Sequence, residues 1–312
     1  MTLLSVRGVS KRFGGLQAVN DLSFDVATGS IKALIGPNGA GKTTLFDLIS
    51  GFLPPDSGEI VFGGAEIQAM SSCQVAVRGM VRTFQHIRLF PKMTVLENIM
   101  VGRHVHSRAG FLAGMLNLPF TWGEEIHGMS SCEVAVRGMV RTFQHIRLFP
   151  KMTVLENIMV GRHVHSRAGF LAGMLNLPFT WAEERRIREK SFEIMELLGI
   201  AAHARTEAVR LAYGQQRVVE VGRALACEPK LLLLDEPAAG LNMRETNEMG
   251  GLISRIRDMG VTVLLVEHDM SLVMKISDEV VVLSYGQKIA EDRPLAIQKN
   301  REVIRVYLGD DQ

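Results

Sequence analysis

The chain has 312 residues, of which 47% are apolar and 22% charged, a balance that allows one large globular domain or two small ones with a substantial core. Its formal net charge of +2 gives no indication of a nucleic-acid partner. The first 15 residues lack the features of a signal peptide, and no apolar run approaches the length that spans a bilayer. Because the three cysteines, Cys73, Cys132 and Cys227, show no metal or disulfide spacing, we expect a reduced chain in the cytosol.

The polarity pattern predicts two kinds of strand. Residues 5–13, 22–26 and 59–63 alternate in polarity, which is typical of half-exposed antiparallel strands. Residues 231–234, 261–266 and 280–283 are continuous apolar runs, the pattern of strands buried on both faces of a parallel sheet. Between these groups, residues 182–198 place apolar side chains on one helical face, and we expect Gly199 to end that helix.

An internal repeat occupies the middle of the chain. Residues 71–122 recur as residues 130–181, an offset of 130 − 71 = 59 positions, and the copies differ only at Gln74 and Glu133. Weaker similarity upstream extends the units to 64–122 and 123–181. A solenoid would repeat more than twice, so we interpret the repeat as a tandem duplication inside a gene or an error in the sequence. Each copy carries a capping box that opens a helix, at residues 94–97 and 153–156.

A phosphate-binding motif lies near the N-terminus. Residues 36–43 match G-x-x-x-x-G-K-[ST] at every position, after an expected strand at 31–35 and before an expected helix at 43–50. In that context a chance glycine turn is a poor alternative. Lys42 would reach the β- and γ-phosphates of a nucleotide, and the Thr43 hydroxyl would hold Mg²⁺. Backbone N–H groups and the helix N-terminus would surround the phosphates, so the expected nucleotide ligands are Gly36, Pro37, Asn38, Gly39, Ala40, Gly41, Lys42, Thr43 and Thr44.

Two further motifs carry chemistry. The four leucines at 231–234 deliver Asp235 and Glu236 to the carboxyl edge of the expected parallel sheet, where α/β sheets bind ligands. Asp235 would steady Mg²⁺ through water, and Glu236 would accept a proton from the attacking water or orient it. This acid pair is strong evidence only in combination with the phosphate-binding motif. Upstream, an anion-binding helix start is expected at Leu211, Ala212, Tyr213, Gly214 and Gln215.

These motifs, in this order, resemble the ABC ATPase family. The remaining family elements are a glutamine loop at Gln85 or Gln144, a D-loop at residues 238–242 and a switch histidine at His268. The resemblance implies an α/β fold, a P-loop NTPase (RecA-like) core with an antiparallel β subdomain and a helical subdomain. It places one ABC ATPase domain over 1–312, with residues 182–227 completing the helical subdomain and signature helix and 228–312 the C-terminal part of the core. Phrases such as residues 12–16, 81–85 and 303–309 are similar to one of the two ATPases of high-affinity branched-chain amino-acid importers.

The resemblance also implies a mechanism and partners. ATP and Mg²⁺ would lie between the P-loop of one subunit and the signature at 211–215 of a second ABC ATPase. Phe13 would stack on adenine, although core packing is a serious alternative for it, and His268 would contact the γ-phosphate. Thr43, Asp235 and the glutamine loop would serve the metal. The subunit would lie at the cytoplasmic face of the membrane with two permease subunits, served indirectly by a periplasmic or extracellular solute-binding protein.

Residues 211–215 read L-A-Y-G-Q where the common family signature reads L-S-G-G-Q, and the departure that matters is Ala212, which has no hydroxyl for a γ-phosphate oxygen. We therefore expect a heterodimer with a related ATPase whose serine signature completes the stronger site, although a homodimer stays open. A soluble ABC ATPase of DNA repair or translation is a weaker alternative, since the chain has one P-loop and no heptad run. A non-functional product of the duplication is the third.

We expect that only one copy of the repeat can occupy the fold. The first copy is favoured because it emerges first, which makes Gln85 the working residue, Gln144 idle and 123–181 a surplus insertion near Trp122. Removing one copy leaves 312 − 59 = 253 residues, a usual length for the family.

Overall fold

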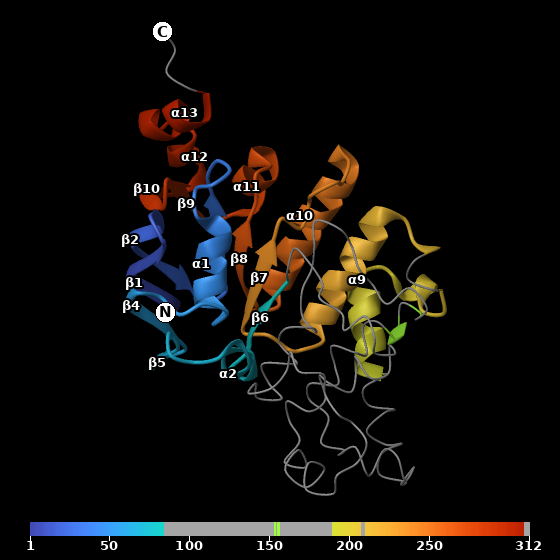
Figure 1. Cartoon of the computed structure of the whole chain (residues 1–312). Coiled ribbons are helices and arrows are strands. Elements are labelled where there is room, and N and C mark those ends of the chain that lie inside the picture. Colours follow the sequence, from blue (N-terminus) through green and yellow to red (C-terminus); the bar gives the residue numbers. More distant parts are fainter. Residues whose placement is uncertain (84–152, 154, 157–188, 207–209, 309–312) are drawn as a thin grey trace, which may run out of the picture. The chain divides into compact units, whose positions relative to one another are not determined.

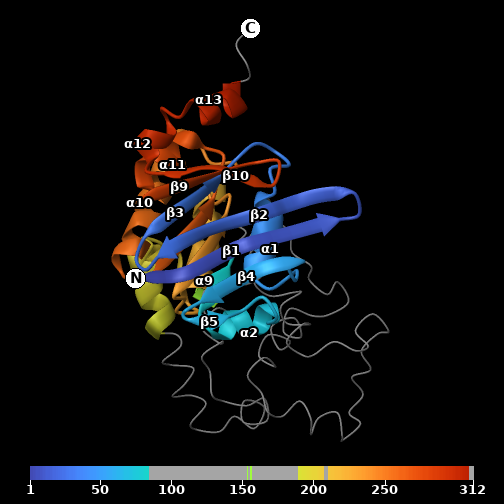
Figure 2. The same ribbon diagram turned by 90° about the vertical axis from the view of Figure 1, so that its left-hand side faces the viewer.

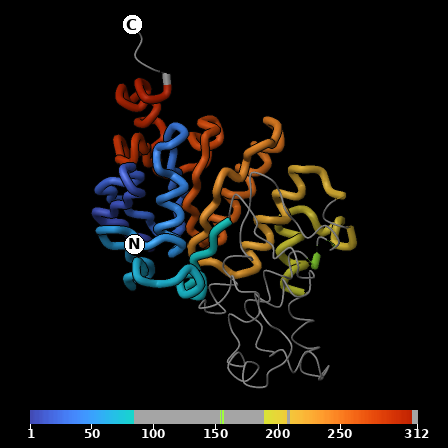
Figure 3. The backbone as a smooth tube through the Cα atoms, in the orientation of Figure 1, coloured from blue at the N-terminus to red at the C-terminus, as the bar shows by residue number. Residues whose placement is uncertain are grey.

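A computed structural model describes residues 1–83, 153, 155–156, 189–206 and 210–308 (Figures 1 and 3). The chain divides into two compact units, Met1–Arg82 with Pro229–Gln312, and Thr83–Glu228. We refer to them as the core unit and the helical unit. Among the described residues, none of the helices combines the length and apolar character needed to cross a bilayer.

The core unit contains an antiparallel sheet of four strands in the order β2-β1-β4-β5. Strands β1 (Thr2–Phe13) and β2 (Leu16–Ala27) form a long hairpin, visible in Figure 2, and β4 (Ser57–Phe62) pairs with the other edge of β1. β5 (Ala65–Glu66) adds a short edge. Alternate residues of β1 and β2 face the core, so the antiparallel strands predicted from alternating polarity are confirmed, and β1 and β2 extend beyond the predicted bounds.

The second sheet of the core unit is the parallel sheet that the apolar runs predict. Its order is β10-β9-β3-β8-β7-β6, with only the edge strand β10 antiparallel to its neighbour. Every residue of the central strands is buried, because helices cover both faces. The strands are β3 (Ile31–Ile35), β6 (Met80–Arg82), β7 (Leu231–Asp235), β8 (Thr262–Val266), β9 (Glu279–Ser284) and β10 (Gln287–Asp292).

Strand β3 is packed on both faces. Leu34 belongs to the larger apolar cluster, together with Leu45 and Phe46 of helix α1 (Lys42–Ile49). Ala33 and Ile35 point to the opposite face and join a smaller cluster with the C-terminal helices. The other helices of the core unit are α2 (Ser72–Val77), α10 (Met243–Asp258), α11 (Met270–Ile276), α12 (Pro294–Ile297) and α13 (Arg301–Leu308).

A buried lysine interrupts the apolar pattern of β3. Lys32 is 2% exposed, and its Nζ lies 2.6 Å from Glu291 Oε1 and 2.8 Å from Glu279 Oε2. A buried ammonium is tolerated only with such partners. The two carboxylates come from β9 and β10, so this charge cluster ties the edge of the sheet to the strand that leads to the phosphate-binding loop.

The helical unit contains α9 (Tyr213–Leu225), a short 3₁₀ helix (η4, Ala201–His203) and helical residues 189–197. Residues 189–197 confirm the described part of the helix predicted over 182–198, and Gly199 follows with φ +71°. The capping box of the second repeat copy is formed, since the Thr153 N–H donates to Glu156 at 2.8 Å and the Glu156 N–H donates to Thr153 Oγ1 at 3.3 Å. Its counterpart at 94–97 lies outside the described residues.

The cysteine prediction is wrong in one respect. Cys73 is disulfide-bonded, whereas Cys227 is free and buried. Cysteine spacing along a chain does not reveal which side chains meet in space, so this bond could not be predicted from the sequence.

Candidate nucleotide site

The phosphate-binding loop is shaped by two close backbone contacts. A Cβ at Gly36 would lie 2.3 Å from the Leu283 carbonyl oxygen, and a Cβ at Gly41 would lie 2.3 Å from that of Ala18. Both distances are far inside van der Waals contact, and both glycines have positive φ, +155° and +96°. Only glycine therefore allows the loop between β3 and α1 to sit this close to its neighbours.

Backbone hydrogen bonds hold the loop from the side of the β9–β10 hairpin. The Gly286 N–H donates to the Ala40 carbonyl at 3.1 Å, and the Gly286 carbonyl accepts from the Asn20 N–H at 2.8 Å. Gly41 is the N-cap of α1 and receives no side-chain capping bond. The first turn of α1 thus keeps its N–H groups, with their positive dipole end, for an anion.

Lys42 curls back over the loop. Its Nζ donates to the carbonyls of Gly36 at 2.6 Å and Pro37 at 3.0 Å. Burial lowers the pKa of Lys42, while Glu236 and Asp235 oppose that shift. The two carboxylates are therefore electrostatic neighbours of this lysine. Thr43 is exposed beside it, Thr44 is half-buried, and Asn38 and Gly39 are exposed.

The acid pair lies where the sequence predicts. Asp235 is the last residue of β7 and is 3% exposed, and Glu236 follows directly. Glu236 adopts the left-handed conformation, with φ +49°, and its N–H donates to the Val266 carbonyl of β8 at 2.9 Å. A non-glycine residue in that conformation stores strain, which is common at functional sites.

Arg82 is a site residue that the sequence analysis missed. At the end of β6 its guanidinium donates to Asp235 Oδ2 at 3.2 Å, to Asp47 Oδ1 at 2.6 Å and to Ser50 Oγ at 3.1 Å. Burial raises the pKa of Asp235, and the charge of Arg82 partly offsets that rise. Arg82 thereby joins β6, β7 and α1 through buried charge. Its partners lie 35 positions before it and 153 after it, so no local sequence pattern could have identified them.

A second carboxylate orders the region of the switch histidine. Glu267 is 1% exposed, and it accepts from the N–H groups of Ala238 at 2.8 Å and of His268 at 3.0 Å. Burial raises the pKa of Glu267, and these backbone donors oppose the rise. His268 itself is 63% exposed, with Nδ1 3.9 Å from Glu236 Oε2. The structure therefore brings His268, Glu236 and the start of the expected D-loop together.

Phe13 lies at the end of β1 with its side chain 45% exposed. The Lys11 ammonium lies 5.8 Å from the ring centroid. An aromatic ring this accessible is not a core residue, so the packing alternative is wrong and the ring is free to stack on a flat ligand.

The expected signature begins α9 in the helical unit. Ala212 is the N-cap, is exposed and offers no side-chain cap, while its N–H donates to Gln215 Oε1 at 3.3 Å. Arg217 donates to the Tyr213 hydroxyl at 3.2 Å and lies 5.6 Å from the Tyr213 ring centre. Leu211 and Gly214 are buried. The helix N-terminus is thus ordered by side chains of its own helix.

The structure describes only some of the other expected ligands. Gln85 and Gln144 lie outside the described residues. Within the described part, no three His, Cys, Asp or Glu residues gather as a metal cage. Thr43 at the start of α1 and Asp235 at the end of β7 are oxygen donors of the kind Mg²⁺ takes alongside a nucleotide, so the residues present fit that ion.

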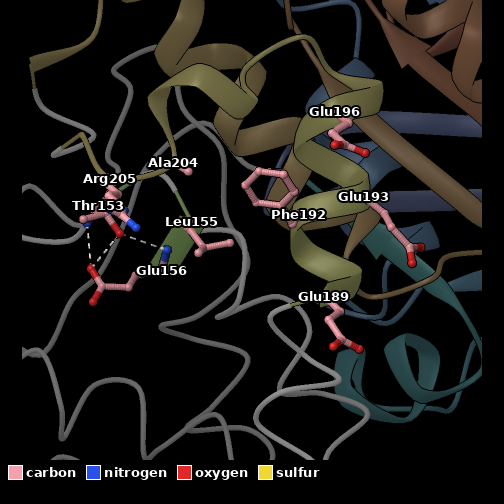
Figure 4. A pocket seen from close by; sticks show the side chains of 9 residues that line it. All are labelled: Thr153, Leu155, Glu156, Glu189, Phe192, Glu193, Glu196, Ala204 and Arg205. Carbon is pink, nitrogen blue, oxygen red and sulfur yellow. Dashed lines mark hydrogen bonds between the residues drawn. The ribbon is translucent and has the colours of Figure 1, made fainter.

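A cavity of about 660 Å³ lies in the helical unit (Figure 4). Its lining carries four carboxylates and one guanidinium, from Glu156, Glu189, Glu193, Glu196 and Arg205. Phe192 and Leu155 supply apolar surface. So acidic a lining repels a triphosphate, and we exclude this cavity as the nucleotide site.

The buried Arg82 network should be a main source of stability. Arg82→Met should lower the free energy of unfolding by about 3–5 kcal/mol, because it leaves Asp47 and the buried Asp235 without their counter-charge. Urea unfolding followed by circular dichroism measures this. Arg7→Met is the matched control, since Arg7 pairs with Asp25 at a surface where both side chains are nearly half exposed, and it should cost less than about 1 kcal/mol. Equal losses in the two variants would contradict the role given to Arg82.

Comparisons with known proteins agree with this geometry. The family model described as ABC transporter matches residues 19–136 and 119–239, and the model described as branched-chain amino acid ATP-binding cassette transporter matches 287–312. The high-affinity branched-chain amino acid transport ATP-binding protein LivG of Escherichia coli (strain K12) is 38% identical over 309 residues, 99% of this chain and 98% of that protein. The corresponding protein BraF of Pseudomonas aeruginosa is 37% identical over 309 residues, 99% of this chain and 98% of that protein.

The solved structures agree as well. The ADP conformation of an ATP-binding cassette of an ABC transporter superposes with a TM-score of 0.66 at 26% identity, covering 99% of this chain and all of that one. The α/β fold class expected from the sequence, a P-loop core with antiparallel and helical parts, is confirmed. Family model, relatives and structure together establish that this chain belongs to the ABC transporter family of ATP-binding proteins.

Proposed function

We propose that this subunit hydrolyses ATP to drive the import of branched-chain amino acids through membrane permease subunits. The observation that carries the proposal is the gathering of Lys42, Asp235, Glu236 and His268 around the glycine loop at the carboxyl edge of one sheet. The relatives named above are branched-chain amino acid transport ATP-binding proteins, which supports the substrate class.

Each residue of the site has a role in binding. The N–H groups of residues 38–44 and the Lys42 ammonium hold the phosphates, and the exposed Phe13 ring stacks on adenine. Thr43 and Asp235 would hold Mg²⁺, which would supply positive charge to stabilise the phosphates. Arg82 holds the Asp235 carboxylate by a hydrogen bond at 3.2 Å, and its charge opposes the rise in the pKa of Asp235 that burial causes.

The residues that act on the γ-phosphate are Glu236 and His268. A water oxygen attacks phosphorus as the Glu236 carboxylate takes its proton, and the bond between the γ-phosphorus and the bridging oxygen of ADP breaks. His268 is exposed and lies within 3.9 Å of Glu236, so it can reach the γ-phosphate from the same side. Glu267 places both the His268 backbone and Ala238 of the D-loop.

Glu236→Gln tests the hydrolytic role. We expect turnover to fall by at least about 10²-fold, because the amide cannot accept the water proton, with nucleotide affinity changed less than about threefold. The variant should also trap an ATP-bound dimer. Steady-state phosphate release, binding of a fluorescent ATP analogue and size-exclusion chromatography measure the three outcomes. Glu248→Gln on the exposed surface of α10 is the control. Turnover near that of the wild type would remove Glu236 from this role, and a wild-type protein without ATPase activity would favour a non-functional duplication product.

The second ATPase of the complex is a different chain. Ala212 is exposed at the start of α9 and brings no hydroxyl to a nucleotide held by its partner. A hydrogen bond to a charged group contributes about 1.5–3 kcal/mol, so a composite site built on this signature is the weaker one. A partner with a serine signature would complete the stronger site over this chain's P-loop. The assembly lies at the cytoplasmic face of the membrane and serves a periplasmic or extracellular solute-binding protein.

Ala212→Ser tests this pairing. In the homodimer we expect the substitution to raise ATPase activity by about tenfold or more, because it restores the missing donor on both sites. Co-expression with a serine-signature partner and two permeases should activate the wild-type chain to a similar degree and support uptake of labelled leucine. A homodimer that is fully active and unchanged by either manipulation would refute the pairing. Absence of co-purification with permeases would favour a non-transport ATPase.

The repeat contributes to the fold from both copies. The sheet position beside β7 is filled by Met80–Arg82 of the first copy. In the helical unit, the second copy supplies Thr153 and Glu156, and the Leu155 N–H donates to the Ala204 carbonyl at 3.3 Å. These pairings favour a surplus that lies in the sequence between Thr83 and Thr153, in place of 123–181. The interval from Arg82 to Thr153 exceeds that from Arg82 to Thr94 by 153 − 94 = 59 positions, one repeat length.

Gln85 is then the glutamine of the working loop, because it follows β6 by only three residues. Gln85→Ala should lower coupled ATPase activity by about tenfold, whereas Gln144→Ala should leave it unchanged. Loss in Gln144→Ala alone would reverse the assignment, and equal partial losses would mean that the copies exchange.

Deletion tests the surplus itself but cannot choose between copies. Removing 84–142 or removing 123–181 yields the same chain of 253 residues, since 84–122 and 143–181 are identical. We expect that chain to be soluble and to dock onto permeases; unfolding would contradict a surplus.

A further inference from the structure

The C-terminal helix places a tyrosine under the phosphate-binding loop. On α13, Val303 is 4% exposed, and Tyr307 lies one helical turn later on the same face. Both pack against the apolar cluster formed by Ala33 and Ile35 of β3 with residues of β9. Figure 1 shows α13 beside α12 at one end of the core unit. The strand that leads into the loop is thus supported by α1 on one face and by α13 on the other.

The hydroxyl of Tyr307 is buried at the point where β3 becomes the loop. Its oxygen has no hydrogen-bond partner within ordinary limits of distance and angle among the described residues. Burial raises the pKa of Tyr307 to about 12, and the backbone N–H of Gly36 opposes that rise. A buried polar atom without a full hydrogen bond is costly, and Gly36 is the group poised to satisfy it.

Neither group at this contact has much freedom to move independently. Gly36 is pressed against the Leu283 carbonyl on its Cα side, and Lys42 holds its carbonyl at 2.6 Å. The Tyr307 ring is fixed by the apolar cluster. When a nucleotide binds, its phosphates replace the loop carbonyls as the partners of Lys42. A small movement of the loop at this step would change the distance between the Gly36 N–H and the Tyr307 oxygen.

We propose that Tyr307 is a positioning residue for nucleotide binding, whose hydroxyl accepts a hydrogen bond from the Gly36 N–H when the loop closes on phosphate. Because the Tyr307 oxygen lacks a full hydrogen bond in this structure, a bond completed on closure adds more to nucleotide affinity than to the stability of the free protein. The Tyr307 hydroxyl acts on the loop backbone and does not contact the base or the γ-phosphate. This proposal rests on the ATP-binding function proposed above.

Tyr307→Phe is the test, since it keeps the ring and removes only the hydroxyl. We expect the Kd for a fluorescent ATP analogue with Mg²⁺, and the KM for MgATP, to rise together by about two- to tenfold, the worth of one hydrogen bond. The kcat should change less than about twofold, and the Tm of the nucleotide-free protein should stay level or rise, because a buried unsatisfied atom has been removed. Tyr285→Phe, at a side chain that is 91% exposed, is the control and should change nothing.

The alternative is that Tyr307 only fills space beneath the sheet. Tyr307→Phe would then leave Kd and KM at the wild-type values, with or without a higher Tm, and that result would overturn the proposal. Failure of the wild-type protein to bind the analogue would instead overturn the proposed function, so the two failures are distinguishable.

Discussion

The nucleotide site depends on one steric constraint, the closeness of the phosphate-binding loop to two backbone carbonyls. Ala18 lies in the antiparallel sheet and Leu283 in the parallel sheet, and each leaves no room for a Cβ at its facing glycine. These two close contacts restrict the path of the loop between β3 and α1. The site can therefore exist only when both sheets of the core unit are complete, and the long β1–β2 hairpin serves the site as well as the core.

Charge burial imposes a second dependence. Asp235 must stay ionised to serve a cation, yet it lies at the end of a fully buried strand where desolvation favours the neutral acid. Arg82 opposes this effect because it brings a fixed positive charge that is itself shared with Asp47 of α1. The short edge strand β6 thus has a task beyond closing the sheet. It connects Asp235, the acid that ends β7, with the helix that follows the phosphate-binding loop.

Local patterns predicted what local physics determines. Period-two alternation and apolar runs located the strands, and the glycine-lysine motif located the loop. Both succeed because the pleat of a strand and the sterics of a tight loop depend on residues that are adjacent in the sequence. Arg82, Glu267 and Tyr307 were missed or unassigned, because each acts through a residue that is distant in the sequence, Asp235, Ala238 and Gly36 respectively. The disulfide at Cys73 escaped prediction for the same reason. Phe13 could be placed on a strand, but only the structure decided that its ring faces solvent.

Either copy of the repeat could fill the same place in the fold, and the residues of the two copies do not decide which one does. The copies differ at a single position within 71–122, and in the first copy that residue, Gln74, completes the capping box of α2 by accepting from the Ser71 N–H at 2.9 Å. Glutamate serves equally at that place in a capping box and is also favoured by the helix dipole, so Glu133 would not disqualify the second copy. Local energy therefore does not select the first copy. What distinguishes it is its connection to β5, since α2 and β6 of the first copy follow β5 directly along the chain, and the loop between β5 and the strand beside β7 is therefore shorter than it would be with the second copy. By the same argument, the second copy is favoured beside residues 189–206, because it is the copy nearer to them along the chain. Both preferences are satisfied only if the surplus lies between the part of the first copy and the part of the second copy that enter the fold.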